Sequence, residues 1–224
     1  MSLVVKICGL STPDTVDVAL DAGADMVGFV FFPPSPRHID LGLARELGAR
    51  VKGRAQKVAL SVDADDALLG NAIDALRPDL LQLHGRESVA RVRDIKARFS
   101  LPVMKAIPVE KAGDLAGVAG YAEVADRILF DARAPKEATR PGGLGRSFDW
   151  HLLDGVDRAV PFMLSGGLTA DNVAAALAIT RAPGVDVSSG VESALGVKDP
   201  DKIRAFIRAA RAGVASAGKN VMRA

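Results

Sequence analysis

The sequence predicts a single-domain α/β protein in which eight parallel strands and their helices close into a (β/α)8 barrel. Short apolar runs alternate with segments of helical periodicity, a pattern typical of parallel sheets built from βα units. Eight such units fit within the 224 residues of the chain, and barrels of this kind run to about 250 residues. The glycine clusters also come late, whereas an open doubly wound sheet usually carries a glycine fingerprint after its first strand. The closed barrel is therefore the favoured fold.

Each expected strand is a short apolar run. Most are continuously apolar, as strands covered on both faces are. In chain order they are Leu3–Cys8, Asp25–Phe31, Lys57–Val62, Leu80–His84, Pro102–Ile107, Arg127–Asp131, Phe162–Ser165 and Val185–Ser188. Together they would form the whole wall of the barrel.

Each expected helix follows one of these strands. In chain order the helices are Pro13–Asp21, Gly42–Val51, Ala64–Leu76, Glu87–Arg98, Ala112–Tyr121, Trp150–Leu153, Ala170–Thr180 and Pro200–Arg211. Thr12, Thr169 and Asp199 stand directly before helices as N-cap candidates. The barrel is expected to occupy residues 1–211, and residues 212–224, which lack an apolar stripe, are expected to form a flexible C-terminal tail.

Composition excludes several classes of function. Lys and Arg number 29 against 27 Asp and Glu, an excess too small and dispersed for a nucleic-acid footprint. The longest apolar run, Met26–Phe32, falls far short of the ~20 residues that a membrane span needs. No signal-peptide pattern opens the chain, and the single cysteine cannot form an internal disulfide, which agrees with a reducing compartment. We therefore expect a cytoplasmic protein that binds neither nucleic acid nor membrane.

Glycine- and serine-rich turns follow the last two expected strands. Gly166 and Gly167 follow the seventh strand, and Ser188, Ser189 and Gly190 end the eighth. Barrels commonly bind phosphate on these two loops, because glycine lets backbone N–H groups approach an anion closely. Either cluster alone is explained as well by a tight strand-to-helix turn. Their occurrence at adjacent loops favours a phosphate site.

A third glycine cluster ends a long polar loop that begins at Ala132. Gly143 and Gly145 lie in this cluster, and Lys136 and Arg140 lie earlier in the loop. A long loop without secondary structure in a compact domain is usually either functional, such as a lid over a ligand, or disordered. The sequence leaves both interpretations open.

Cys8 and Asp131 end the first and sixth strands, at the edge of a barrel where catalytic residues gather. Cys8 is either a small buried hydrophobe or a reactive thiolate, and the second role would need neighbouring cations or backbone donors. Lys6 points to the same side of its strand as Cys8. Asp131 follows two apolar residues, a setting that suits a general acid, although a carboxylate there could also cap a turn or pair with Arg133.

Two further residues could face a ligand. His84 ends the fourth strand, where it is either a hydrogen-bonded barrel residue or an acid or base. Arg37 lies in the Pro-rich second loop, where it could bind a carboxylate with its forked donors or could simply be solvated. The three histidines are scattered, and no H-x-x-x-H, C-x-x-C, G-x-S-x-G or P-loop pattern occurs, so we expect no metal site and no hydrolase chemistry.

Six segments, in order along the chain, resemble the phosphoribosylanthranilate isomerase family. They are Lys6–Leu10, Gly28–Phe31 with Ser35–Arg37, Gln82–Gly85, Leu129–Asp131, Ser165–Leu168 and Asp186–Glu192. These segments span nearly the whole chain, and the opening K-I-C-G combined with the late D-V-S-S-G-V-E is specific. Related phosphate-binding barrels share the late glycines without the cysteine.

The resemblance implies an Amadori rearrangement of N-(5′-phosphoribosyl)anthranilate to 1-(2-carboxyphenylamino)-1-deoxyribulose 5-phosphate in tryptophan biosynthesis, without a cofactor. By position, Asp131 would be the general acid and Cys8 the general base, while Arg37 would hold the anthranilate carboxylate. His84 and Asp186 would line the site. The phosphate would be bound by Gly166, Gly167, Ser188, Ser189 and Gly190, with Gly143 and Gly145 as additional loop contacts.

One residue departs from the family pattern. Leu144 stands where the G-G-T/S-G loop carries a hydroxyl, which predicts altered loop mobility or affinity rather than loss of function. Two alternatives stay open: a histidine-pathway isomerase of a related aminoaldose phosphate, which would place an Asp at the position of Cys8, and a non-catalytic barrel that only binds a phosphorylated metabolite. The expected partner is a phosphorylated small molecule, and the barrel is expected to act as a monomer or homodimer.

Overall fold

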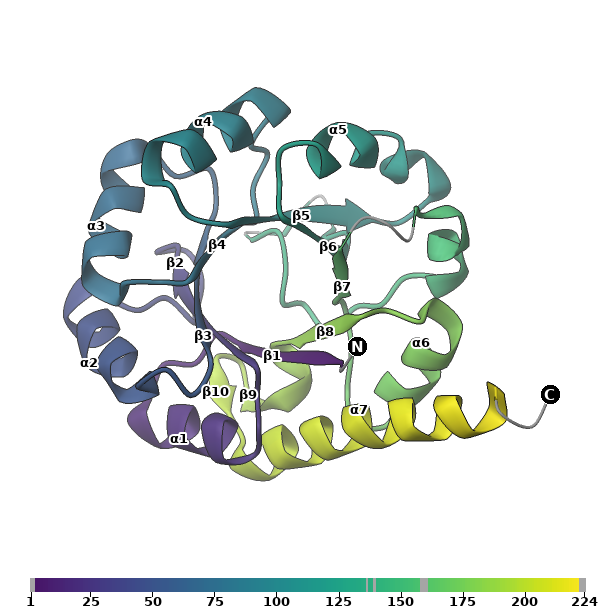
Figure 1. The fold of residues 1–224 in the computed structure, drawn as a ribbon. Coiled ribbons are helices and arrows are strands. Elements are labelled where there is room, and N and C mark those ends of the chain that lie inside the picture. The colour runs from purple at the N-terminus through teal and green to yellow at the C-terminus, as the bar shows by residue number, and fades with distance from the viewer. Residues whose placement is uncertain (1–2, 136, 139, 158–160, 222–224) are drawn as a thin grey trace.

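A computed structural model of the protein has the predicted fold: eight parallel strands close into a barrel inside a ring of helices (Figure 1). It describes residues 3–135, 137–138, 140–157 and 161–221. The strands pair in chain order from β1 to β8, and β1 then pairs with β8 to close the barrel. The barrel fold predicted from the sequence is thereby confirmed.

The barrel strands agree with the predicted ones to within two residues at each end. They are β1 (Val4–Cys8), β2 (Met26–Phe31), β3 (Gln56–Ser61), β4 (Leu80–Leu83), β5 (Val103–Val109), β6 (Arg127–Ala132), β7 (Phe162–Leu164) and β8 (Gly184–Val187). A short antiparallel hairpin after β8, formed by β9 (Glu192–Ala194) and β10 (Val197–Lys198), was not predicted. Strands of two or three residues are too short to show a periodicity.

The outer ring consists of α-helices and short 3₁₀ helices. They are α1 (Pro13–Asp21), α2 (Leu41–Val51), α3 (Asp66–Leu76), α4 (Val89–Phe99), η1 (Ala112–Leu115), α5 (Val118–Ala122), η2 (Trp150–Gly155), α6 (Val173–Thr180), η3 (Ser189–Val191) and α7 (Pro200–Val221). Among the described residues, no helix is long and apolar enough to cross a bilayer.

Local chemistry explains where several helices begin. Thr12 accepts a hydrogen bond from the Thr15 backbone N–H, as predicted for an N-cap. Asp199 likewise accepts hydrogen bonds from backbone N–H groups of the first turn of α7. The N-cap predicted at Thr169 is wrong. There a turn comes first, in which the Thr169 N–H donates to the Asn172 side chain, and α6 starts only at Val173.

Three predicted helices differ in extent. The single helix expected over residues 112–121 is broken into η1 and α5, because three glycines in that segment weaken a helix. The segment at Trp150 forms a 3₁₀ helix that ends at Gly155. Helix α7 continues past Arg211 to Val221, since its continuation is rich in Ala and free of Pro. Flexibility of residues 212–224 stays a prediction, and residues 222–224 lie outside the described part of the chain.

Strand alternation divides the side chains between two cores. On β1, Val5 and Ile7 pack in the large core between strands and helices, whereas Val4 packs with a smaller cluster inside the barrel. That inner cluster takes one or two residues from each of six strands: Met26, Val58, Leu80, Met104, Ala106, Leu129 and Met163. Inward-facing residues nearer the carboxyl ends of the strands include polar ones, beginning with Lys6 and Gln82, beside the apolar Val30 and Leu60. The apolar plug therefore fills one end of the barrel and leaves the other end for polar groups.

Helix α7 provides a test of the outer core. It runs beside α1 and α6 (Figure 1), and Phe206 is fully buried at that contact. We expect Phe206→Ala to lower the free energy of unfolding by about 3–5 kcal/mol, because it removes a buried ring and leaves a cavity. Arg208→Ala, an exposed position on the same helix, should change it by less than about 0.5 kcal/mol. Urea denaturation measures both, and equal effects would mean that α7 is not docked as described.

Candidate active site

A cavity opens at the carboxyl ends of the barrel strands. Every residue that the sequence analysis placed in the site lines it. These residues are Cys8, Arg37, His84, Asp131, Gly143, Gly145, Gly166, Gly167, Asp186, Ser188, Ser189 and Gly190. The structure thus brings together side chains from the first strand to the last. The structure gives their positions, and their roles depend on the chemistry of their surroundings.

Cys8 lies above a buried ion pair. The Lys6 ammonium is 2.7 Å from the Asp186 Oδ1, and both side chains are almost completely shielded from solvent. Ser165 donates a hydrogen bond to the other carboxylate oxygen of Asp186, at 3.3 Å. Gly28, on the neighbouring strand β2, makes the arrangement possible: a Cβ there would lie 2.9 Å from the Cys8 Sγ and 3.1 Å from the Lys6 Nζ. The thiol and the ammonium therefore share the space above one glycine.

This environment acts on the thiol in two directions. Burial raises the pKa of Cys8 above its ordinary value, and the charge of Lys6 opposes that rise. Burial alone would lower the pKa of Lys6, but the facing Asp186 carboxylate and Cys8 raise it, so the amine is held as an ammonium. The Cys8 side chain is thus held beside a cation that favours its ionisation, against the opposing effect of burial.

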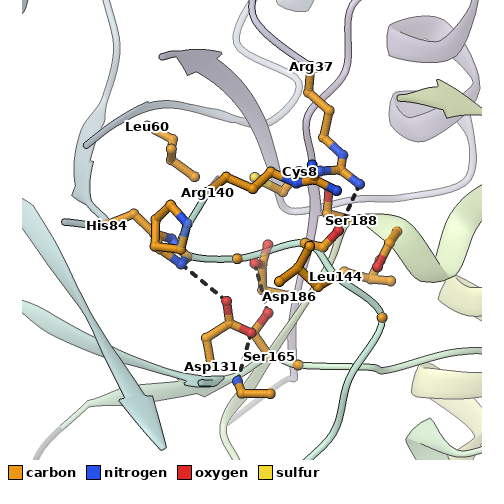
Figure 2. A pocket seen from close by; sticks show the side chains of 18 of the residues that line it. Cys8, Arg37, Leu60, His84, Asp131, Arg140, Leu144, Ser165, Asp186 and Ser188 are labelled. Carbon is orange, nitrogen blue, oxygen red and sulfur yellow. Dashed lines mark hydrogen bonds and ion pairs between the residues drawn. The ribbon is translucent and has the colours of Figure 1, made fainter. Parts of the chain in front are cut away.

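Asp131 and His84 form a second pair on another wall of the cavity (Figure 2). The His84 Nε2 is 3.1 Å from the Asp131 Oδ2, and the Asp131 Oδ1 accepts a hydrogen bond from the Ala132 N–H at 2.9 Å. The other ring nitrogen of His84 is 2.9 Å from the Gln82 amide nitrogen. The amide nitrogen of Gln82 can only donate, so the His84 Nδ1 accepts and the neutral imidazole carries its proton on Nε2. His84 therefore donates a hydrogen bond to the Asp131 carboxyl group.

Arg37 is held by a second buried charge cluster. Its Nε and Nη2 donate to the two carboxylate oxygens of Glu192, at 2.6 and 2.9 Å, and Nη2 also donates to the Gly143 carbonyl. Lys198 donates to Glu192 at 2.7 Å and to the Ser188 carbonyl at 2.8 Å. The hairpin of β9 and β10 supplies both Glu192 and Lys198, so its function is to fix Arg37 in place. Part of the Arg37 guanidinium, which was expected to bind a ligand carboxylate, is therefore already hydrogen-bonded to Glu192 and Gly143.

The long loop after β6 lies across the mouth of the cavity. A Cβ on Gly142 would lie 2.7 Å from the Asp131 Oδ2, and one on Gly143 would lie 2.5 Å from the Arg37 Nη1. Gly143 also has a positive φ of 68°, a conformation that side chains rarely adopt. The loop therefore touches both the acidic pair and Arg37, which favours the lid among the two interpretations left open. Lys136 lies outside the described residues.

Backbone donors gather at the turns after β7 and β8. Gly166 and Gly167 have positive φ values of 89° and 62° in the turn after β7, and Ser189 and Gly190 open the short helix η3 after β8. Such turns point N–H groups outward, as an anion site requires. The Ser188 hydroxyl is already 3.1 Å from the Lys198 Nζ, which adds a cation behind this wall.

Sequence reasoning missed two features of the cavity. The first is Arg140, whose Nε is buried without a hydrogen-bond partner among the described residues and whose side chain reaches toward Arg37 in Figure 2. Burial and the charge of Arg37 lower the pKa of Arg140. The second is an apolar wall formed by Val30 and Leu60, against which Phe32 and Val62 pack. No motif marks either feature, because both depend on how separate loops meet.

The chain matches known proteins over nearly its whole length. A family model described as N-(5′-phosphoribosyl)anthranilate (PRA) isomerase matches residues 5–209. The N-(5′-phosphoribosyl)anthranilate isomerases of Bradyrhizobium diazoefficiens and Nitrobacter hamburgensis are each 73% identical to this chain over 212 residues. These alignments cover 95% of this chain, 95% of the first protein and 94% of the second.

Solved structures of similar proteins share the architecture. The crystal structure of phosphoribosyl anthranilate isomerase from Thermotoga maritima matches with a TM-score of 0.85 and 36% identity, over 94% of this chain and 99% of that chain. A phosphoribosyl anthranilate isomerase in complex with reduced 1-(o-carboxyphenylamino)-1-deoxyribulose 5-phosphate matches with a TM-score of 0.82 and 32% identity, over the same shares. Monomers generated from the dimeric T. maritima protein match equally well, with a TM-score of 0.82.

The buried Lys198 predicts a specific pH dependence of stability. Burial lowers the pKa of Lys198 to about 8, whereas the unfolded chain keeps the ordinary value near 10.5. Below pH 8 both states are protonated and this group adds no pH dependence. Between these values the unfolded state binds more protons, so the free energy of unfolding should rise with pH, by at most about 1.4 kcal/mol per pH unit from this group. Because the raised pKa of Cys8 acts in the opposite direction, the test is the difference: in urea denaturation between pH 7 and pH 10, the wild type and the exposed control Lys52→Met should gain stability relative to Lys198→Met. An unchanged slope in Lys198→Met would contradict it.

Proposed function

The chain belongs to the N-(5′-phosphoribosyl)anthranilate isomerase family, and from that premise we propose how its cavity works. It is an isomerase of tryptophan biosynthesis that converts the aldose N-(5′-phosphoribosyl)anthranilate into the ketose 1-(2-carboxyphenylamino)-1-deoxyribulose 5-phosphate. The observation that carries the assignment of roles is that an acid, Asp131, and a base, Cys8, line one cavity between an anion site and an apolar wall.

Asp131 is the general acid of the first step. It gives its proton to the furanose ring oxygen, the bond from that oxygen to C1 breaks, and the nitrogen lone pair forms a C1–N iminium cation. The hydrogen bond from His84 supports this step, since the Nε2–H group stabilises the Asp131 carboxylate that the transfer leaves behind. Asp131 is 5% exposed, so the proton is kept from bulk water.

Cys8 is the general base of the second step. As a thiolate it removes the proton from C2, and the electron pair of the C–H bond moves to C1 and neutralises the iminium nitrogen. The enolamine then tautomerises to the ketose, so no oxidant or cofactor enters the balance. The iminium also helps the base: a cation formed next to the buried Cys8 thiol favours the thiolate that the step requires. Ring opening and proton abstraction are thereby coupled.

The two anionic ends of the substrate bind to different groups of the cavity. The phosphate binds to backbone donors of Gly166, Gly167, Ser189 and Gly190, with Ser188 and the loop glycines Gly143 and Gly145 around it. The anthranilate ring packs on the apolar wall at Leu60. Its carboxylate binds between Arg37 and Arg140, because two guanidinium groups that face one cavity leave a site for an anion between them.

The proposal also includes the cellular location and the oligomeric state of the enzyme. We place the enzyme in the cytoplasm, where the other steps of amino-acid biosynthesis would supply and consume its phosphorylated metabolites. It acts as a monomer or a homodimer. Support comes from the related T. maritima protein, which is described both as a dimer and as monomers derived from it.

Loss of either proton-transfer group should stop catalysis without abolishing binding. We expect Cys8→Ser and Asp131→Asn to lower kcat/KM by about 10²–10⁴-fold, the usual contribution of a general acid or base. The fall of anthranilate fluorescence in the substrate measures turnover, and calorimetry with the reduced product analogue measures binding. Asp74→Asn, an exposed position on α3, is the matched control. No conversion by the wild type would overturn the function, and full activity of either variant would overturn that residue's role.

Arg140 should contribute to affinity only through the carboxylate. Arg140→Met is expected to weaken binding of the reduced product analogue about tenfold, since it removes one charge-assisted contact. The same analogue without the ring carboxylate should bind wild type and variant alike. Arg93→Met, an exposed position on α4 with the same change in charge, should bind both compounds as the wild type does. A loss for both compounds would instead place Arg140 at the phosphate.

A further inference from the structure

Lys6 is the most deeply buried charged side chain at the site, and neither proton transfer uses it directly. It is 0% exposed and lies on β1 two residues before Cys8, on the same face of the strand. Its partner Asp186 lies directly opposite on β8, because Lys6 and Asp186 are paired in the register that closes the barrel. Burying two charges costs free energy that packing by apolar residues would avoid. An ion pair in this position calls for a functional explanation.

We propose that Lys6 and Asp186 are positioning residues that control the ionisation of the Cys8 thiol, with Lys6 promoting the thiolate and Asp186 restraining it. The inference rests on the proposed role of Cys8 as the base. Lys6 lies beside the Cys8 thiol, since a Cβ on Gly28 would lie 3.1 Å from the Lys6 Nζ and 2.9 Å from the Cys8 Sγ, and the Lys6 charge favours the thiolate. Asp186 holds the ammonium at 2.7 Å and so fixes its distance from the thiol.

Counting charges in the buried triad of Lys6, Cys8 and Asp186 gives the direction of each effect. With the thiol protonated the wild-type triad is neutral, and ionisation of Cys8 leaves one net negative charge. Without the Lys6 ammonium, ionisation would leave two negative charges. Without the Asp186 carboxylate, ionisation would leave a neutral thiolate–ammonium pair. Because uncompensated charge is costly in a desolvated site, the thiolate should be least stable without Lys6 and most stable without Asp186.

Other charged groups around the thiol do not change this order. Lys198 on β10 favours the thiolate while it is charged, but its pKa of about 8 leaves it largely neutral in the range where Cys8, whose pKa is raised, titrates. Arg37 and Arg140 add positive charge from two loops, and Asp131 and His84 face the cavity from β6 and the end of β4. All of these remain in place when Lys6 or Asp186 is changed. The comparison of single variants therefore isolates the triad.

The chain offers a direct readout, because Cys8 is its one cysteine. A thiolate absorbs ultraviolet light at wavelengths where a thiol does not, so a pH titration of this absorbance reports the ionisation of Cys8. The Cys8→Ser variant is titrated in the same way, and subtracting its absorbance removes the contribution of Tyr121. The measurement needs no substrate and no reagent access to the buried sulfur. It is made on the wild type, Lys6→Met, Asp186→Asn and the double variant, each checked for native circular dichroism.

The expected midpoints follow the charge count. Relative to the wild type, Lys6→Met should titrate at higher pH and Asp186→Asn at lower pH, each by about one unit or more. The double variant restores the wild-type charge balance, so its midpoint should return toward that of the wild type. If one single variant folds poorly, the double variant and the other single variant still test the proposal. A merely structural pair would loosen the site in both variants and move both midpoints in the same direction. Shifts of the same sign, or no shift in either variant, would overturn the proposal.

A measurement of turnover distinguishes failure of this proposal from failure of the proposed function. If the wild type converts the substrate, kcat in Lys6→Met should rise with pH more steeply above neutrality than in the wild type, following the displaced thiolate. If the wild type does not convert the substrate, the function fails, yet the order of the midpoints still decides the role of the ion pair.

Discussion

The Lys6–Asp186 ion pair joins the first and last strands of the barrel directly below the cysteine. Its two residues face each other in the β1–β8 register, so the contact that closes the barrel also sets the charge of the site. The pair is stable in the interior only because each partner finds the other at 2.7 Å and Asp186 has a further donor in Ser165. A barrel that failed to close would leave two unpaired charges in an apolar interior.

Buried ion pairs also fix the charged side chains at the mouth of the cavity. Arg37 comes from the loop after β2, and its partners Glu192 and Lys198 come from the hairpin after β8. Ile39 and Val191 anchor these two segments in the apolar core, and the buried ion pairs determine where the guanidinium lies. Glu192 is well suited to this, since its pKa is lowered by Arg37 and Lys198 even though burial alone would raise it. The cavity is thus built from groups that are charged before any substrate arrives.

The fold and most of the site could be predicted from the sequence because both follow from alternation along strands. Cys8, His84 and Asp131 end strands at inward positions, so their convergence follows once the barrel is recognised. The pairing of Lys6 with Asp186 depends on strand register, and the pairing of Arg37 with Glu192 bridges 155 positions. Such contacts leave no local pattern. Arg140 was missed for the same reason, because its place depends on the path of a long loop.

Acid and base are supported by separate networks, and this separation matters for an isomerase that uses only proton transfers. Asp131 on β6 is tied to His84 and Gln82, whereas Cys8 on β1 is tied to Lys6 and Asp186, with strands β7 and β8 between them in the barrel. Asp131 must begin the reaction protonated, whereas Cys8 must lose its proton. These are opposite requirements on two groups in one cavity. The imidazole N–H of His84 stabilises the Asp131 carboxylate once its proton has been given up, and the Lys6 ammonium favours the Cys8 thiolate. Placing these supports on different strands lets each be set without disturbing the other.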